Sequence, residues 1–190
     1  VIGNVVEKKS TSAISDLATV LNVQPEKLKT NVYSDLNMEE DENKQFYKTY
    51  QTISRLMSSS RSNMVPDTST GKTVTELASE TLFDILTDET NVNINESTGA
   101  VELNPVEILK DVYTNVGADN LAFSNQADID QIAATHGSVI QVLAETPVDS
   151  ANFLDDIGKA YAASNEITNE LMEIVDTSIA NSTSGDGGTG

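Results

Sequence analysis

Both periodicities that define this fold occur in residues 73–117, which read TVTELASETLFDILTDETNVNINESTGAVELNPVEILKDVYTNVG. The apolar positions of residues 74–86 recur every three to four residues, as in an amphipathic helix. In Val92–Asn95, and again in Val101–Leu103, apolar and polar residues instead alternate strictly. Because the turn-forming residues Glu96–Gly99 separate the two alternating runs, the sequence predicts a small β-hairpin between helices.

Helical periodicity dominates the remainder of the chain. Asn104, Pro105 and Gly117 are typical of the cap, the first residue and the C-terminal stop of a helix. We therefore predict an all-α bundle of five to six helices with one small β-hairpin insertion. The expected helices are Thr11–Leu21, a short turn from Pro25, Met38 to about Ser59, Thr73 or Thr75 to about Asp88, Asn104 to Val116, Ser124 or Asn125 to about Thr146, and Asp149 or Ser150 to about Asn181.

The predicted domain is a single helical unit over residues 1–180, of which 1–10 form an N-terminal extension. The last helix is expected to be the longest and to turn Leu154, Ile157 and Tyr161 inward. Residues 58–71 are loop-like, with a mobile arm as an alternative. Residues 181–190, rich in Gly, Ser and Thr, are typical of a flexible linker. Since the chain begins with Val1 and has no signal-peptide pattern, we expect a segment of a longer protein.

Charge and composition restrict the classes of function. Residues 1–61 contain eight basic and eight acidic residues, so the net charge of −19 lies entirely in residues 62–190. Such a surface disfavours nucleic-acid binding and suits salty water, where the Debye length is about 8 Å or less. The chain has no Cys, which excludes disulfides and thiol chemistry, and no apolar run long enough for a membrane span. Together these features favour an exported, extracellular or cell-surface bacterial protein.

No catalytic constellation is found, and we predict no catalytic, cofactor or metal residues. His136 is the single His and lies on an apolar stripe, so we expect it in the core or at its boundary. Asp128 and Asp130 are close in sequence but lie on another face of the predicted helix. The patterns Glu-x-x-His, Gly-x-Ser-x-Gly and Gly-x-x-x-x-Gly-Lys are absent.

Calcium binding remains open in the acidic half. Asn91, Asn93, Asn95 and Glu102 occupy positions 1, 3, 5 and 12 of an EF-hand frame, but Glu96 stands where that loop needs Gly. We therefore favour the hairpin for this segment. Two further acidic clusters, Met38–Asn43 and Asp155–Asp156, are interpreted as the first turn of a helix and a solvated pair.

The five tyrosines are expected in the core: Tyr33, Tyr47, Tyr50, Tyr113 and Tyr161.

The order of elements resembles the helical modules of very large, repetitive bacterial surface proteins of the cadherin-like and RTX-adhesin type. The resemblance spans most of residues 11–185. It rests on Val20–Val23, Tyr33–Leu36, Tyr50–Ile53 and Ala163–Ile167. It implies a helical module followed by a Gly/Ser/Thr/Asp tail that leads to β-sandwich repeats, and the family has no catalytic residues.

We therefore expect a non-enzymatic structural or adhesive module that acts as a spacer, assembly or docking domain. Its partners would be protein modules of the same or another surface protein, bridged by divalent cations at the acidic surface. A small-ligand or glycan-binding module is the alternative, which a cleft lined by Tyr47, Tyr50 or Tyr113 would favour. An enzyme-accessory or lyase-like α-domain would require tyrosines, His136 and carboxylates to converge.

Overall fold

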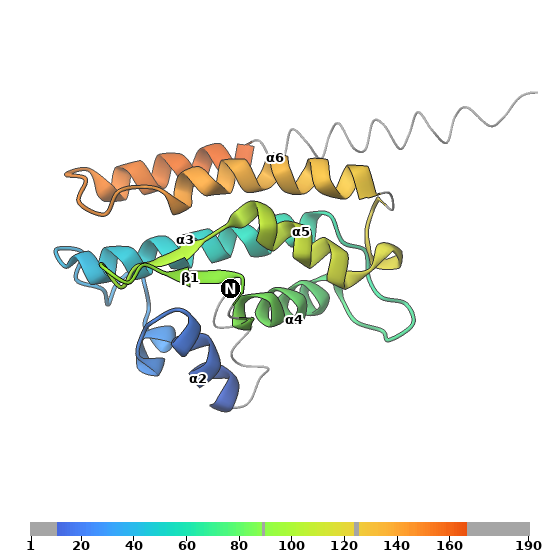
Figure 1. The fold of residues 1–190 in the computed structure, drawn as a ribbon, viewed down its shortest axis with the longest axis horizontal. Coiled ribbons are helices and arrows are strands. Elements are labelled where there is room, and N and C mark those ends of the chain that lie inside the picture. Colours follow the sequence, from blue (N-terminus) through green and yellow to red (C-terminus); the bar gives the residue numbers. More distant parts are fainter. Residues whose placement is uncertain (1–10, 89, 124–125, 167–190) are drawn as a thin grey trace, which may run out of the picture.

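A computed structural model describes residues 11–88, 90–123 and 126–166 (Figure 1). Within these residues the predicted all-α bundle with one hairpin is confirmed. The elements are α2 (Thr11–Val20), η1 (Pro25–Lys29), α3 (Asp41–Ser62), α4 (Val74–Thr87), β1 (Val92–Ile94), β2 (Val101–Leu103), α5 (Pro105–Val116), η2 (Ala118–Asn120), α6 (Gln126–Ala144) and a last helix that begins at 153 and is described to 166. The expected N-terminal extension, the remainder of the last helix and the linker at 181–190 lie outside the described residues.

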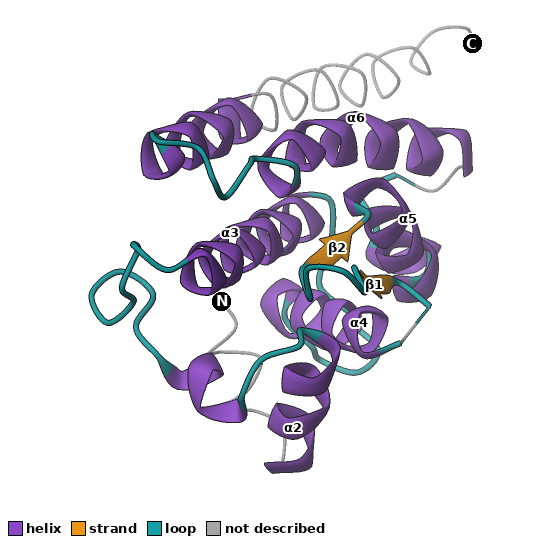
Figure 2. Ribbon diagram, turned by 60° about the vertical axis from the view of Figure 1, so that its left-hand side comes forward, coloured by secondary structure: helices purple, strands orange, loops and turns teal. Residues whose placement is uncertain are grey.

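The helices stack in three layers. The last helix and α6 form one outer layer, α3, the hairpin and α5 form the middle layer, and α4 and α2 form the other outer layer (Figures 1 and 2). Both α3 and α5 pack against α6 on one side and against α4 on the other. Because α3 is covered from both sides, even polar residues in its second half, such as Thr52 and Ser60, are buried.

The core is formed by the apolar positions that the helical period predicts. In α5, Ile108, Leu109 and Val112 are fully buried. The stripe of α6 is buried from Ile129 to Leu143. At Gly137 the two helices approach so closely that a Cβ atom would lie 2.5 Å from the Val106 Cα, so a residue without a side chain is required there.

The hairpin forms at the predicted residues, with the turn between the two alternating runs. Val92 pairs with Leu103, Asn93 with Glu102 and Ile94 with Val101. Gly99 has a φ of +68°, which glycine adopts without strain. The alternation buries Val92, Val101 and Leu103 against the helices and turns Asn93 and Glu102 outward.

Three expectations need correction. The long helix α3 begins at Asp41 rather than Met38, because Asn37 accepts a hydrogen bond from the Glu39 amide in a turn before it. The last helix begins at 153 rather than 149 or 150, and it buries Phe153 while Leu154 is 52% exposed. Among the tyrosines expected in the core, Tyr33 is 71% exposed.

No helix among the described residues is both long and apolar enough to cross a membrane.

Candidate functional site

Two polar regions are candidates for function. The first, which we call the buried polar network, joins α3 to α5, α6 and the last helix. Each of its members is at most 5% exposed, apart from the ring of Tyr161 and the side chain of Asn165 at its edge. Its buried members are Arg55, Ser59, Asn63, Tyr113, His136 and Ser164.

His136 lies at the centre of this network, in the core as the stripe predicted. Its Nδ1 is 2.5 Å from the Ser59 Oγ, and the ring is 3% exposed. Burial, together with the nearby Arg55 charge, lowers the pKa of His136 from 6.5 to about 4. The imidazole is therefore neutral at neutral pH.

A serine beside a histidine is the arrangement that activates a nucleophile. Here Ser59 is fully buried and the ring is almost so, and neither lines the open cleft described below. Asp130 does not orient the ring, because it faces Lys110 at 3.5 Å. In this conformation the pair has no route to a substrate.

Arg55 fastens the last helix to α3. Its Nε donates to the Ser164 Oγ at 2.9 Å and its Nη2 to the Ser164 carbonyl oxygen at 3.0 Å. Its Nη1 donates to the Asn165 Oδ1 at 3.2 Å, and the guanidinium lies 5.3 Å from the centre of the Tyr161 ring. Several charge-assisted contacts thus compensate for burying the cation.

The other end of the network joins α3 to α5. The Asn63 Nδ2 donates to the Tyr113 hydroxyl at 3.0 Å, and that hydroxyl donates to the Ser59 carbonyl oxygen at 3.3 Å. Burial raises the pKa of Tyr113 to about 12. Within the described residues every buried side-chain nitrogen and oxygen has a hydrogen-bond partner, which fits a structural role for the network.

Tyr113 lies in the core as expected, but the burial of Arg55, Ser59, Asn63 and Ser164 with His136 was not predicted from the sequence. Arg55, Ser59 and Asn63 recur at i, i+4 and i+8, so they form a polar stripe along one side of α3. That stripe is the available signal, but on an isolated helix it is read as the solvent-facing side. Only the packing of α3 between two layers turns it inward.

The acidic segments are tied into local contacts. In the hairpin, the Asn95 Nδ2 donates to the Glu102 Oε1 at 3.0 Å, and the extended strands replace the coiled loop of an EF-hand. In the run before α3, Asp41 pairs with Lys44 and Glu42 with Lys27, each at 3.0 Å. Across the part of the chain that the structure describes, no three His, Asp or Glu side chains gather as a metal site.

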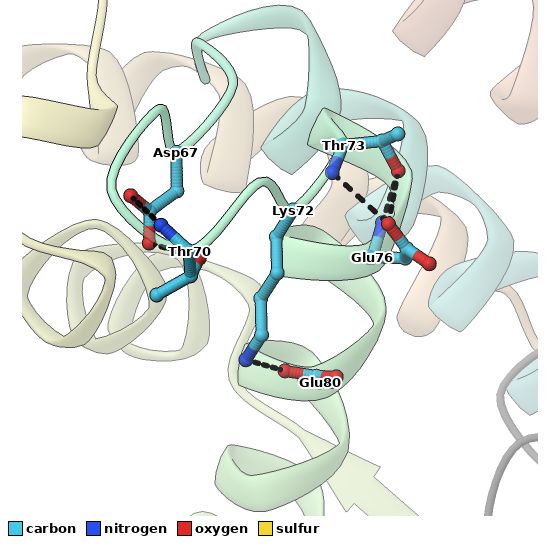
Figure 3. A network of polar contacts seen from close by, with 6 residues as sticks. All are labelled: Asp67, Thr70, Lys72, Thr73, Glu76 and Glu80. Atoms are coloured by element: carbon cyan, nitrogen blue, oxygen red, sulfur yellow. Dashed lines mark hydrogen bonds and ion pairs between the residues drawn. The ribbon is translucent and has the colours of Figure 1, made fainter.

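The loop before α4 is also ordered by hydrogen bonds, which argues against the mobile-arm alternative (Figure 3). The Asp67 carboxylate accepts hydrogen bonds from Ser69 and Thr70, which hold its pKa well below the usual range. Thr73 and Glu76 form a reciprocal capping box at the start of α4. A β-bridge between Met64 and Leu121 anchors the loop to the body of the domain.

The second candidate region is an open cleft of about 680 Å³ between α3, the hairpin and α6. None of the five tyrosines lines it. Tyr33 instead packs edge-on against Tyr47 and Tyr50, with each pair of ring centres 6.3 Å apart. We call the cleft the open polar cleft; its polar lining includes Gln45, Lys48, Asn93, Glu102, Ser138 and Gln141.

Lys48 is a partly buried residue of the cleft lining. Its Nζ donates to the Thr146 carbonyl oxygen at 3.1 Å. Burial lowers the pKa of this lysine, and the charge of Glu102 opposes that shift. The cleft therefore contains both a cation and a carboxylate, among neutral amide and hydroxyl groups.

Comparisons with protein-family models, curated proteins and solved structures found no match.

Proposed function

We propose that this chain is a non-enzymatic structural or adhesive module of a large exported bacterial surface protein, in which it acts as a spacer, assembly or docking domain. The main support is the contrast between the buried polar network, which has little contact with solvent, and the strongly acidic charge of the chain. The groups with catalytic potential are engaged in holding helices together. The charged groups available to a partner are mainly carboxylates, most of them in residues 62–190.

The acidic half has few cations of its own to neutralise it. Its three lysines each contact a carboxylate of the same chain, in the pairs Lys72–Glu80, Lys110–Asp130 and Lys159–Asp155. Like charges also crowd where α4 ends beside α5. Burial raises the pKa of Asp111, and the charges of Glu107 and Asp88 raise it further. Divalent cations would relieve this repulsion and bridge the surface to a second acidic module.

Sedimentation velocity of the whole chain tests the bridging step. We compare about 5 mM calcium, a concentration suited to weak extracellular sites, with sodium chloride of equal ionic strength. Calcium-specific association supports cation-bridged docking, and it should weaken in the triple variant Asp88→Asn, Glu107→Gln, Asp111→Asn. A matched variant of the neutral half, Asp16→Asn, Glu26→Gln, Glu39→Gln, should behave as the parent. Association that follows ionic strength alone overturns bridging and leaves a passive spacer.

A fluorophosphonate probe tests the non-enzymatic part of the proposal, because such probes label activated serines. We expect no adduct on the folded chain, with Ser59→Ala as the control. A covalent adduct on Ser59 under native conditions would show that the pair with His136 is both accessible and activated, and would overturn the proposal.

A second candidate function, binding of a small ligand or glycan, is favoured by the open polar cleft. A volume of about 680 Å³ lies within the range of about 300–1,000 Å³ found for small-ligand sites. The tyrosines that the sequence suggested for such a site lie elsewhere, so the support comes from the amide, hydroxyl and charged groups of the cleft alone.

A further inference from the structure

The open polar cleft is built from elements that are distant in sequence. Gln45 and Lys48 come from α3, Asn93 and Glu102 from the outward side of the hairpin, and Gln141 from α6. Asn93 and Glu102 are directly paired across the two strands, so their side chains leave the hairpin on the same face. The hairpin insertion thus supplies part of the cleft lining.

Hydrogen bonds within the domain hold side chains of the cleft in place. The Gln45 Nε2 donates to the Val101 carbonyl oxygen at 3.2 Å, and the Gln141 Nε2 donates to the Glu145 Oε1 at 2.8 Å. A primary amide has two N–H groups and a carbonyl oxygen, so one such bond orients the group without exhausting it. Side chains oriented before binding lower the entropy cost of capturing a ligand.

The charged residues of the cleft determine whether an anionic, cationic or neutral ligand is favoured. Glu102 and Glu145 line it, and the chain carries a net charge of −19, so an anion is repelled. A cation would be attracted by these carboxylates but would lie beside the Lys48 ammonium, which its bond to Thr146 holds in place, whereas a neutral ligand meets no repulsion from either sign of charge. An apolar molecule would leave the amides and the charged groups without water or partners, which is costly.

We propose that the open polar cleft binds a neutral, hydroxyl-rich ligand of the saccharide class. Sugar hydroxyls donate and accept at once, which matches amides, a serine hydroxyl, an ammonium group and carboxylates arranged around one cavity. This inference rests on the second candidate function and assigns its ligand class and its residues. It is independent of docking through the acidic surface.

Two-dimensional NMR of the whole chain, with maltose and cellobiose as neutral probes, tests the ligand class. Glucuronate and glucosamine are similar rings that carry a negative and a positive charge. We expect saturable shifts of the Gln45 and Gln141 side-chain amides at millimolar neutral disaccharide, and at least tenfold weaker binding of glucuronate, which the carboxylates repel. Gln141→Ala should weaken binding at least tenfold, whereas Gln131→Ala, on the exposed side of α6, should not change it.

The outcomes separate the ligand class from the function. Shifts at the cleft with a charged sugar but with neither disaccharide would overturn the saccharide assignment and retain a ligand site. Chemical-shift changes around Tyr33 rather than Gln45 would show that the ligand does not bind in the open polar cleft. If none of the four sugars perturbs the cleft, the saccharide assignment fails, and with it the glycan-binding form of the second candidate function. Melting temperatures of the two variants close to that of the parent exclude misfolding as the cause.

Discussion

The buried polar network and the open polar cleft contain similar side chains in opposite surroundings. Each has one long cation, Arg55 in the network and Lys48 in the cleft, together with amide and hydroxyl groups. In the network the groups satisfy one another and exclude water, so their chemistry stabilises the helix packing. In the cleft the same kinds of group face a cavity of about 680 Å³. Exposure, rather than residue type, therefore separates a structural role from a binding role.

This contrast predicts its largest effect at Arg55. Arg55→Ala removes the hydrogen bonds that the buried guanidinium donates to Ser164 and Asn165 and leaves a cavity between α3 and the last helix, so we expect a loss of about 3 kcal/mol in the free energy of unfolding. For a chain of this size that corresponds to a melting temperature lower by roughly 6–12 °C. Arg61→Ala, at the exposed end of the same helix, is the control and should change little.

Hydrogen exchange locates the effect of the Arg55 variant. Amides of residues 157–164 should exchange faster, while those of α5 should follow only the global loss of stability. A variant within about one degree of the parent would mean that the network does not hold the last helix.

A pH effect follows from His136. Its pKa is about 4 in the folded chain and 6.5 when exposed, so the unfolded state binds the extra proton between these values. The contribution is fully present above about pH 6.5 and is lost as the pH falls towards 4. The shift corresponds to about 3 kcal/mol at most.

Urea unfolding of the parent and of His136→Gln, between pH 7.5 and 4.5, measures this contribution. The carboxylates titrate in both proteins, so the difference between them isolates the histidine. The parent should lose more stability than the variant on acidification. Parallel curves for the two proteins would show that His136 is protonated in the folded state as easily as in the unfolded state.

A smaller effect is expected at Tyr113. Tyr113→Phe removes the hydroxyl between Asn63 and Ser59 and leaves the ring in place. We expect a loss of about 1–2 kcal/mol from the unfolding free energy. Tyr33→Phe on the exposed surface is the matched control and should be nearly neutral in thermal melts. Equal effects of the two substitutions would contradict the proposed importance of the buried hydroxyl.

The elements of this fold could be predicted because they depend on local periodicity. The hairpin, the Asn104 cap and the buried stripe of α6 all follow from neighbouring residues. The choice between Phe153 and Leu154 could not be made this way, because it depends on where the helix starts. That start is set by a turn in which the Ser150 hydroxyl donates to the Asp156 Oδ2 at 2.6 Å.

Both candidate regions lay beyond prediction for a different reason. Arg55 and Ser164 are separated by 109 positions, and Ser59 and His136 by 77. Local patterns contain no information on which of these residues meet. The cleft needs α3, the hairpin, the start of α5 and α6 at a fixed spacing, and the composition of an acidic chain does not indicate a cavity lined by amides.

The smallest expected effect is on the titration of Lys48 in the open polar cleft. Burial lowers its pKa from 10.5, whereas bonds to Glu80 and Asp155 raise the pKa of Lys72 and Lys159. Reductive methylation with ¹³C-formaldehyde gives each lysine its own NMR signal, and Lys48→Arg assigns the one in the cleft. Lys48 should titrate at a lower pH than Lys72 and Lys159. Because the charge of Glu102 partly opposes the effect of burial, Glu102→Gln should lower the Lys48 midpoint further, and Glu96→Gln at the hairpin tip should leave it in place. A Lys48 signal that titrates at the ordinary lysine value of 10.5 would place its ammonium in open water rather than in the cleft.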